Sequence, residues 1–365
     1  MRQVSEVNHS VLILGGKLLC FNSKSVKTTG KSSTLCHHLL FLLIMAQDQS
    51  VSSSVLGNSL YWLSKMPLGF LQGLARLAAG VIARIQSASA VKTIERNLLI
   101  AFPHLSPSER QQLAKQALQA QFQSMLEFVK CWGNAPQFSL NQIKQVEGEC
   151  LLTQAIEEKK GLILVVPHFG SWEIMNAWLN QFAAMVIMYK PSKNPQLDQF
   201  VLQARSRLRA TLVPTDENGV RQIFKALKQG GVTAILPDHI PEQSGGIYAP
   251  FFDCPVLTTT LVSRLAQKTQ CAVLQLSCLR NTDHNGFHIK IEAIDDAIRS
   301  KDLQVSVNAL NASIERLIAR HPAHYHWTYK RFKANPLLED IYNLNDAQAI
   351  TRIKAAQADF LAKNS

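Results

Sequence analysis

The sequence predicts an α/β fold, in which a mostly parallel central sheet is flanked by helices and preceded by a helical region. From residue 143 onward, short β-branched and aliphatic runs alternate with amphipathic segments, as in the βαβ units that build parallel sheets. Residues 162–166 are apolar at every position, which is typical of a strand buried on both faces. Residues 46–135 contain no such runs and follow helical periodicity instead.

Composition narrows the class of protein. A chain of 365 residues with 47% hydrophobic and 18% charged residues can bury a large core, so global disorder is excluded. The excess of 38 Lys and Arg over 26 Asp and Glu gives a net charge of +12, which favours an anionic partner such as nucleic acid, an acidic carrier protein or a phospholipid surface. The seven cysteines form no Cys-x-x-Cys pair and are interpreted as reduced thiols, so the catalytic part should face the cytosol.

Residues 1–45 differ from the rest of the chain. Residues 23–34 are polar and unpatterned, and the apolar run at 38–45 is too short to span a membrane. A signal peptide is one interpretation, although no small-residue cleavage site follows. We favour the alternative that the segment 1–45 is a non-native or disordered extension, in which the first 44 residues lie upstream of a start at Met45.

Residues 46–135 are predicted to form a helical, membrane-anchoring region. Residues 56–85 are apolar but interrupted by a minority of polar and basic positions, namely Lys65, Gln72, Arg76 and Arg84. This pattern suits a helix in the membrane interface with Tyr61 and Trp62 near the headgroups, or a short span; a buried core helix is the alternative. Further on, Ser106-Pro-Ser-Glu109 supplies a capping box and an N1 proline for a helix that runs towards Trp132.

The remaining elements follow in order. Strands are expected at residues 143–146, 162–166, 185–189, near 212, 232–236, 272–279 and 287–291. Helices are expected at residues 151–158, 174–182, 196–207, 220–228, 259–268 and 305–319. Residues 337–365 are predicted to be a polar helical tail, because they carry frequent charges and few strong apolar runs.

The most informative motif is His168 with Glu173. Pro167 ends the strand at 162–166, a glycine-containing turn follows, and Ser171 can cap the next helix. His168 therefore lies at the carboxyl end of a central strand, where open α/β sheets bind their ligands. We predict a dyad in which Glu173 hydrogen-bonds one imidazole nitrogen and leaves the other free to activate a hydroxyl. The alternative is a loop histidine followed by a carboxylate that stabilises the helix dipole.

Two other groups of residues are candidates for the site. Residues 190–228 contain eight Lys and Arg against three acidic residues, a net charge of +5, and Arg205, Arg207 and Arg209 are spread around a helix so that not all can face one ligand. Asp238 follows its strand as His168 follows its own, so both should lie at the same sheet edge. Residues 249–252 are interpreted as an apolar wall and residues 258–260 as a hydroxyl-rich helix start. His321, His324 and His326 lack accompanying carboxylates, so neither a metal nor another cofactor is expected.

An ordered series of motifs resembles one known family. The series is His168-x4-Glu173, Tyr189-Lys190-Pro191, Arg205-Ser-Arg207-Leu-Arg209, Pro237-Asp238-His239, Pro250-Phe251-Phe252 with Thr258-Thr259, and Trp327-x3-Arg331-Phe332-Lys333. It is similar to that of the lipid A lauroyl/myristoyl acyltransferases, late-acting bacterial enzymes of the wider glycerolipid acyltransferase group. The resemblance covers roughly residues 60–336, and His239-Ile240-Pro241 departs from it where a His-Asp pair is expected.

The resemblance implies a glycerolipid acyltransferase-like domain at residues 136–336. The implied reaction transfers a fatty acyl group from acyl carrier protein to a hydroxyl of a phosphorylated glycolipid, a lipid A precursor of the Kdo-lipid IVA type. His168 would be the general base and Glu173 its orienting partner; Arg207, Asp238, Arg209 and Lys190 would bind substrate. No metal, cofactor or nucleic acid is implied, and the enzyme would work at the cytoplasmic face of the cell inner membrane.

Three alternatives stay open at this point. The acceptor could be another glycolipid or a phospholipid. The same dyad could activate water in a hydrolase. A membrane scaffold that binds lipid through its basic face is the alternative outside enzymes.

Overall fold

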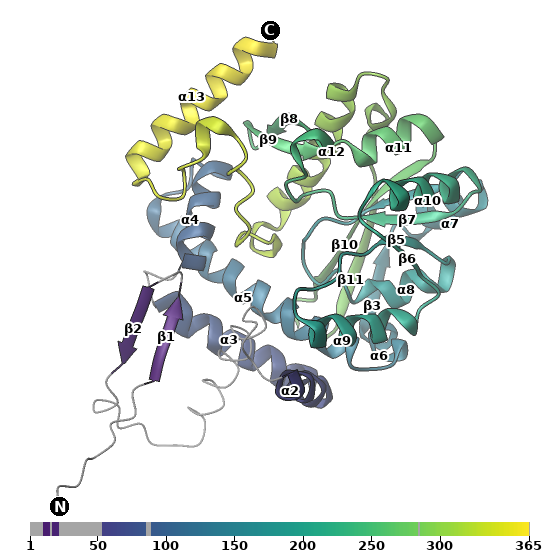
Figure 1. The fold of residues 1–365 in the computed structure, drawn as a ribbon, viewed down its shortest axis with the longest axis horizontal. Helices are drawn as coiled ribbons and strands as arrows, with labels where there is room; N and C mark the ends of the chain where they lie inside the picture. Colours follow the sequence, from purple (N-terminus) through teal and green to yellow (C-terminus); the bar gives the residue numbers. More distant parts are fainter. Residues whose placement is uncertain (1–9, 15–16, 22–52, 85–88, 284, 365) are drawn as a thin grey trace, which may run out of the picture.

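The fold is built around a five-stranded sheet. The structure is a computed structural model that describes residues 10–14, 17–21, 53–84, 89–283 and 285–364. The strand order is β3 (Ile143–Glu147), β11 (Phe287–Ala293), β10 (Ala272–Arg280), β4 (Leu162–Val165) and β7 (Val232–Ile235). Only the β10–β11 pairing is antiparallel, which confirms the predicted mostly parallel sheet. Helices flank this sheet, and the N-terminal helices extend to one side (Figure 1).

Strand β4 occupies the centre of the domain. All four of its residues are completely buried. Ile163 and Val165 belong to one cluster of buried side chains, whereas Leu162 and Leu164 belong to a second cluster on the other face. Because each such side chain contributes roughly 1.5–3 kcal/mol when fully buried, the two clusters hold the end of β4 firmly in place.

Helices cover the sheet as the sequence predicted. They are α7 (Glu149–Glu157), α8 (Met175–Phe182), α9 (Pro195–Ser206), α10 (Glu217–Lys228), α11 (Leu261–Thr269) and α12 (Leu303–Arg320). The predicted bounds of these helices agree with the structure to within a few residues. The strands predicted at 185–189 and near 212 form a separate parallel pair, β5 (Val186–Met188) with β6 (Thr211–Val213), next to β7 through a bridge between Met185 and Val232.

An antiparallel hairpin was not predicted. It consists of β8 (Gly246–Phe251) and β9 (Cys254–Thr259), and helix α11 starts only after it. Pro250 and Pro255 disguise the two strands in the sequence, because proline is rare in sheet interiors; here they lie opposite each other beside the hairpin turn. Of residues 258–260, interpreted as a helix start, Thr258 and Thr259 therefore belong to β9, and only Thr260 lies at the N-cap of α11.

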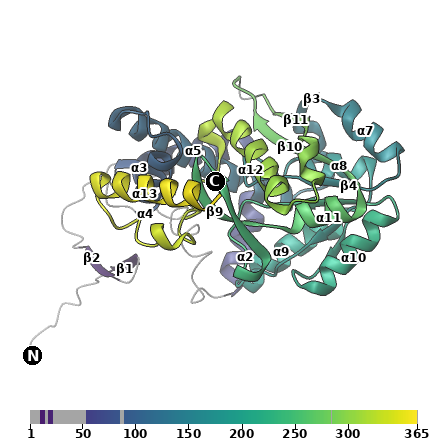
Figure 2. The same ribbon diagram turned by 90° about the horizontal axis from the view of Figure 1, so that it is seen from above.

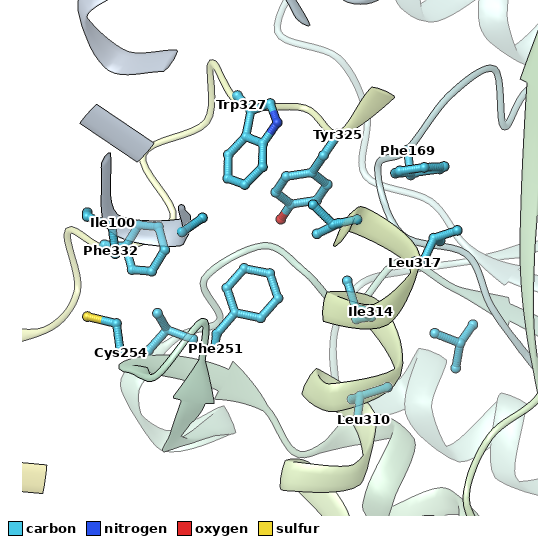
Figure 3. Packing of buried hydrophobic residues seen from close by; sticks show 14 of the residues in the cluster. Ile100, Phe169, Phe251, Cys254, Leu310, Ile314, Leu317, Tyr325, Trp327 and Phe332 are labelled. Atoms are coloured by element: carbon cyan, nitrogen blue, oxygen red, sulfur yellow. The ribbon is translucent and has the colours of Figure 1, made fainter. Parts of the chain in front are cut away.

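The aromatic segment near residue 325 is an integral part of the core. Tyr325, Trp327 and Phe332 are nearly inaccessible (Figure 3). Tyr325 and Phe332 pack with Phe251 of β8, and Trp327 packs edge-on against Tyr325. The buried Arg331 donates hydrogen bonds to the Leu257 carbonyl and the Thr258 hydroxyl in β9, at 2.6 and 2.9 Å. This segment therefore joins the hairpin to the domain, which explains its mixture of aromatic and basic residues.

The N-terminal region is helical, as predicted. It contains α2 (Ser53–Lys65), α3 (Leu68–Arg84), α4 (Ser89–Ala101), α5 (Pro107–Trp132) and α6 (Pro136–Gln142). The capping box of Ser106 and Glu109 at the start of α5 is confirmed. The apolar stretch at 56–85 is divided at Pro67 into α2 and α3, and the chain bends by 118° between them. Within the described residues no single helix is long and apolar enough to span a membrane; only this bent pair meets the length and composition required.

The last described helix lies beside α4, on the side of the molecule away from the sheet (Figures 1 and 2). The C-terminal helix α13 (Asp346–Asn364) is joined to α4 and α5 by ion pairs of Asp346 with Arg96 and Arg110. Near the other end, β1 (Ser10–Leu14) pairs with β2 (Lys17–Phe21). The predicted polar piece at 23–34 and the apolar run at 38–45 lie outside the described residues, so the nature of residues 1–45 stays a prediction.

Candidate active site

His168 and Asp238 form the centre of the candidate site. Strands β4 and β7 are parallel neighbours, with Val165 opposite Ile235. His168 and Asp238 each follow three residues later, so the register of the two strands brings them together. The Nδ1 atom of His168 lies 2.9 Å from Oδ1 of Asp238, and the His168 backbone N–H donates to the same carboxylate. The prediction that both residues lie at one sheet edge is confirmed.

The predicted hydrogen bond between His168 and Glu173 is absent from the structure. Glu173 instead pairs with Arg205 at 2.6 Å and accepts hydrogen bonds from Trp132 Nε1 and Asn176 Nδ2, both at 2.9 Å. Helix α8 begins only at Met175, so Glu173 lies in an irregular turn and not in the first turn of the helix. Its side chain consequently contacts α5 and α9. Asp238 occupies the position beside the imidazole that the sequence assigned to Glu173.

Ser171 was predicted to cap α8, and this prediction is also wrong. Its completely buried hydroxyl donates to Glu127 of α5 instead. The residue at the N-cap of α8 is Ile174, and no side chain caps this helix. The turn between β4 and α8 is therefore fixed by tertiary contacts.

Aromatic rings surround the imidazole of His168. The ring of His239 stacks on it with 3.8 Å between centroids, and His239 stacks in turn on Tyr329. Trp172 makes an edge contact at 5.2 Å. Burial, and then the neighbouring His168, lower the pKa of His239 and of His326 to about 4. Both rings are therefore neutral at physiological pH, and His168 is next to aromatic surfaces without an added positive charge.

The protonation of the pair follows from the electrostatics of Asp238. Burial alone would raise the pKa of this carboxyl, but the charge and the hydrogen bond of His168 lower it well below its usual range. An ionised carboxylate can only accept, so Nδ1 of His168 carries a hydrogen, and in the neutral form of the imidazole Nε2 is then the nitrogen with the free lone pair. The side chain is 17% exposed, and Nε2 has no hydrogen-bond partner among the described residues. This arrangement can accept a proton from a bound hydroxyl group.

A second part of the site lies around Glu173. A solvent-open pocket is lined by the last turns of α5 and α9 and the start of α8, with Glu173, Arg205 and Arg207 in its wall. Arg207 is exposed and donates to the carbonyls of Trp132 and Asn134 at 3.0 and 2.5 Å. The sequence left open which arginine enters the cleft; the structure pairs Arg205 with Glu173 and leaves Arg207 at the rim.

The other two predicted binding residues lie further out. Arg209 is bound to Asn180 at the end of α8, through both its backbone N–H and its guanidinium. Lys190 is exposed just after β5. Sequence reasoning missed His239 and Tyr329 as neighbours of the imidazole, because the stacking of side chains from separate loops leaves no periodic signal. Throughout the described parts of the chain, no three His, Cys, Asp or Glu side chains are close enough to hold a metal ion.

Comparison with known proteins identifies the family. Residues 52–334 match the model of the bacterial lipid A biosynthesis acyltransferases. The chain belongs to this family. This lipid A acyltransferase is 28% identical over 290 residues to the lipid A biosynthesis palmitoleoyltransferase of Escherichia coli K12, covering 76% of the chain and 94% of that protein. It is 25% identical over 295 residues to the lauroyltransferase of the same organism, covering 78% and 95%.

A more distant similarity extends to another type of glycolipid enzyme. The lipid A acyltransferase is 26% identical over 192 residues to a phosphatidylinositol mannoside acyltransferase of Mycobacterium tuberculosis, covering 50% of the chain and 58% of that protein. Both sets of relatives are acyltransferases by name.

Proposed function

We propose that this lipid A acyltransferase transfers a fatty acyl group from acyl carrier protein to a hydroxyl of a lipid A precursor of the Kdo-lipid IVA type, with His168 as general base. The observation that supports this most is the buried Asp238 carboxylate at 2.9 Å from Nδ1 of His168, while the second ring nitrogen has no hydrogen-bond partner within the described part of the chain. An alcohol is a weak nucleophile at neutral pH, and a positioned base contributes about 10²–10⁴-fold to the rate.

The chemical step needs only these side chains and the two substrates. Nε2 of His168 accepts the proton of the acceptor hydroxyl while the oxygen of that hydroxyl attacks the thioester carbonyl carbon. The tetrahedral intermediate then collapses, the carbon–sulfur bond breaks, and the carrier thiolate takes the proton from the imidazolium. Asp238 stabilises the imidazolium while it exists, because the two charges are adjacent in a buried site.

Glu173 and the arginines act on the substrates in this proposal. A guanidinium binds phosphate with two parallel hydrogen bonds, and the anionic glycolipid offers such groups. Glu173 fixes Arg205 by an ion pair in which both side chains are at most 15% exposed. Arg207, at the rim of the same pocket, supplies a second positive charge, and Arg209 and Lys190 extend the positive field outward.

We further propose that α2 and α3 attach the enzyme to the cytoplasmic face of the inner membrane. Large apolar side chains are exposed on these helices: Tyr61, Trp62 and Leu77 are more than half exposed, and Phe70 and Val81 are 45% and 40% exposed. Exposed patches of this kind mark membrane or protein contacts, and aromatic rings favour the headgroup level. The amphiphilic acceptor would then enter from the bilayer beside these helices.

One assay separates this function from its alternatives. Purified enzyme is incubated with acyl carrier protein thioester, with and without the lipid A precursor, and the products are followed by mass spectrometry. The proposal predicts acylated glycolipid and little thioester loss without acceptor. Thioester loss without acceptor would indicate a hydrolase, and no turnover would indicate a scaffold. Preferred acylation of a phosphatidylinositol mannoside would favour the second acceptor class, to which the mycobacterial relative points.

A further inference from the structure

A buried carboxylate lies directly behind the turn that carries His168. Glu127, in the last third of α5, has no exposed surface. Its Oε1 accepts from Arg280 Nε at 2.5 Å and from Gln72 Nε2 at 2.8 Å, and its Oε2 accepts from the Ser171 hydroxyl. These donors come from β10, α3 and the turn after β4. Glu127 therefore joins three separate parts of the fold at one point.

Arg280 completes the group on the other side. Its Nη2 donates to the Ala120 carbonyl and to the Ser124 hydroxyl, both at 2.7 Å. Ser124 is in turn 3.4 Å from the Ser171 hydroxyl. A buried ion pair of this kind gives little net stability compared with apolar residues of the same volume, because the two charges must be desolvated. Its better attested use is to select one geometry among several.

The geometry that is selected here is that of the catalytic turn. Ser171 follows His168 by three residues, and its backbone N–H donates to the Cys278 carbonyl at 2.8 Å. Gly170 has a φ of +61°, and a Cβ at this position would lie 2.2 Å from the same carbonyl oxygen, so the turn is pressed directly against β10. At its other end, the carbonyl of His168 accepts from His326 N–H. The Ser171–Glu127 bond thus fixes the side of the turn that faces α5.

We propose that Glu127 and Arg280 are positioning residues, which act through Ser171 to hold the imidazole of His168 in place for proton transfer. This inference rests on the proposed role of His168 as the base. In this proposal, neither Glu127 nor Arg280 contacts a substrate. Displacement of a catalytic group by about 1 Å can lower a rate about 10²-fold, so loss of this contact should act on kcat.

The test is Ser171→Ala, which removes the link to the turn and leaves the Glu127–Arg280 ion pair in place. Its matched control is Ser306→Ala in α12. Ser306 is also completely buried, and its hydroxyl donates one hydrogen bond, to the Ile298 carbonyl at 2.6 Å. Both variants should lower the melting temperature, Ser171→Ala more than Ser306→Ala, because the Ser171 hydroxyl bonds a charged carboxylate and also lies 3.4 Å from the Ser124 hydroxyl, whereas Ser306 bonds one neutral carbonyl.

The two variants should differ in catalysis. In the full-length enzyme, with acyl carrier protein thioester and lipid A precursor, Ser171→Ala should lower kcat about 10–100-fold with the KM of both substrates within about twofold of wild type. Ser306→Ala should keep kcat within about twofold. Glu127→Gln should lower kcat at least as much as Ser171→Ala, and the double variant should be no worse than Glu127→Gln alone, since Glu127 acts through Ser171.

The inference can fail separately from the proposed function. If wild type transfers acyl groups and His168→Ala abolishes transfer, but Ser171→Ala matches Ser306→Ala in kcat, the positioning role is refuted and the function stands. If Ser171→Ala lost activity only through a higher KM, with kcat unchanged, the positioning role would also be refuted. If the wild-type enzyme does not transfer acyl groups, both the proposed function and the positioning role are refuted.

Discussion

Replacement of Asp238 by asparagine tests the pairing that the structure shows around His168. Asn has the shape of Asp and can occupy the same site, which is only 2% exposed. It lacks the negative charge, and one of its two terminal groups is a donor. The variant therefore changes the electrostatics of the His168 side chain with little change in packing.

The expected fall in kcat can be worked out from the hydrogen bonds of the Asp238 carboxylate. Asp238 accepts from both Nδ1 and the backbone N–H of His168, at 2.9 and 3.0 Å. A hydrogen bond to a charged group contributes about 1.5–3 kcal/mol, and if it is lost in the transition state the rate falls roughly 10–150-fold. The Asn amide can also donate to Nδ1, which would place the imidazole hydrogen on Nε2 and remove the base from part of the enzyme. We therefore expect kcat to fall by ~10²–10³-fold, with KM almost unchanged.

The assay is initial-rate acyl transfer with saturating glycolipid, comparing Asp238→Asn, His168→Ala and the double variant. The double variant should be hardly slower than His168→Ala, because Asp238 has no base left to orient. Asp302→Asn is the control, since this exposed carboxylate caps α12 and Asn caps a helix equally well. If Asp238→Asn kept more than a third of the wild-type kcat, or if its loss multiplied with that of His168→Ala, the proposed pair would be refuted.

Three further predictions concern the arginines, the membrane and pH. Arg205→Lys should reduce transfer more than Arg207→Lys, because Arg205 pairs with Glu173 whereas Arg207 is exposed and donates to the backbone carbonyls of Trp132 and Asn134; equal losses in the transfer assay would contradict this. Replacing both Trp62 and Leu77 by Ser should lower binding to anionic vesicles in sedimentation at high salt, where charge attraction is screened; unchanged binding would place the membrane contact elsewhere. Burial, and then the neighbouring His168, lower the pKa of His239 from about 6.5 to about 4 in the folded state. As the pH falls, His239 is therefore protonated first in the unfolded state, and the free energy of unfolding should decrease between about pH 6.5 and pH 4. Thermal melts of His239→Asn should show a shallower loss over this window, and an identical slope would contradict the prediction.

The sequence by itself determined the elements and the edge of the sheet where chemistry occurs. The apolar run at 162–166 is typical of a strand buried on both faces, and His168 and Asp238 follow two such strands in the same way. Alternation of strands and helices was sufficient to predict a parallel sheet, since period and turn chemistry are local properties. The β8–β9 hairpin was missed because prolines on both strands masked its local signal.

Only the tertiary structure decided which side chains meet. The pairing of His168 with Asp238 depends on the register of β4 against β7, and residues 70 positions apart leave no local pattern. Glu173 lay closer in the sequence, but the turn directs its side chain towards Arg205. Glu127 gave no signal at all, since one carboxylate on an amphipathic helix is expected to face solvent, and only the packing of α5 against the catalytic turn buries it. Local periodicity predicts elements, whereas contacts between distant residues depend on how those elements pack.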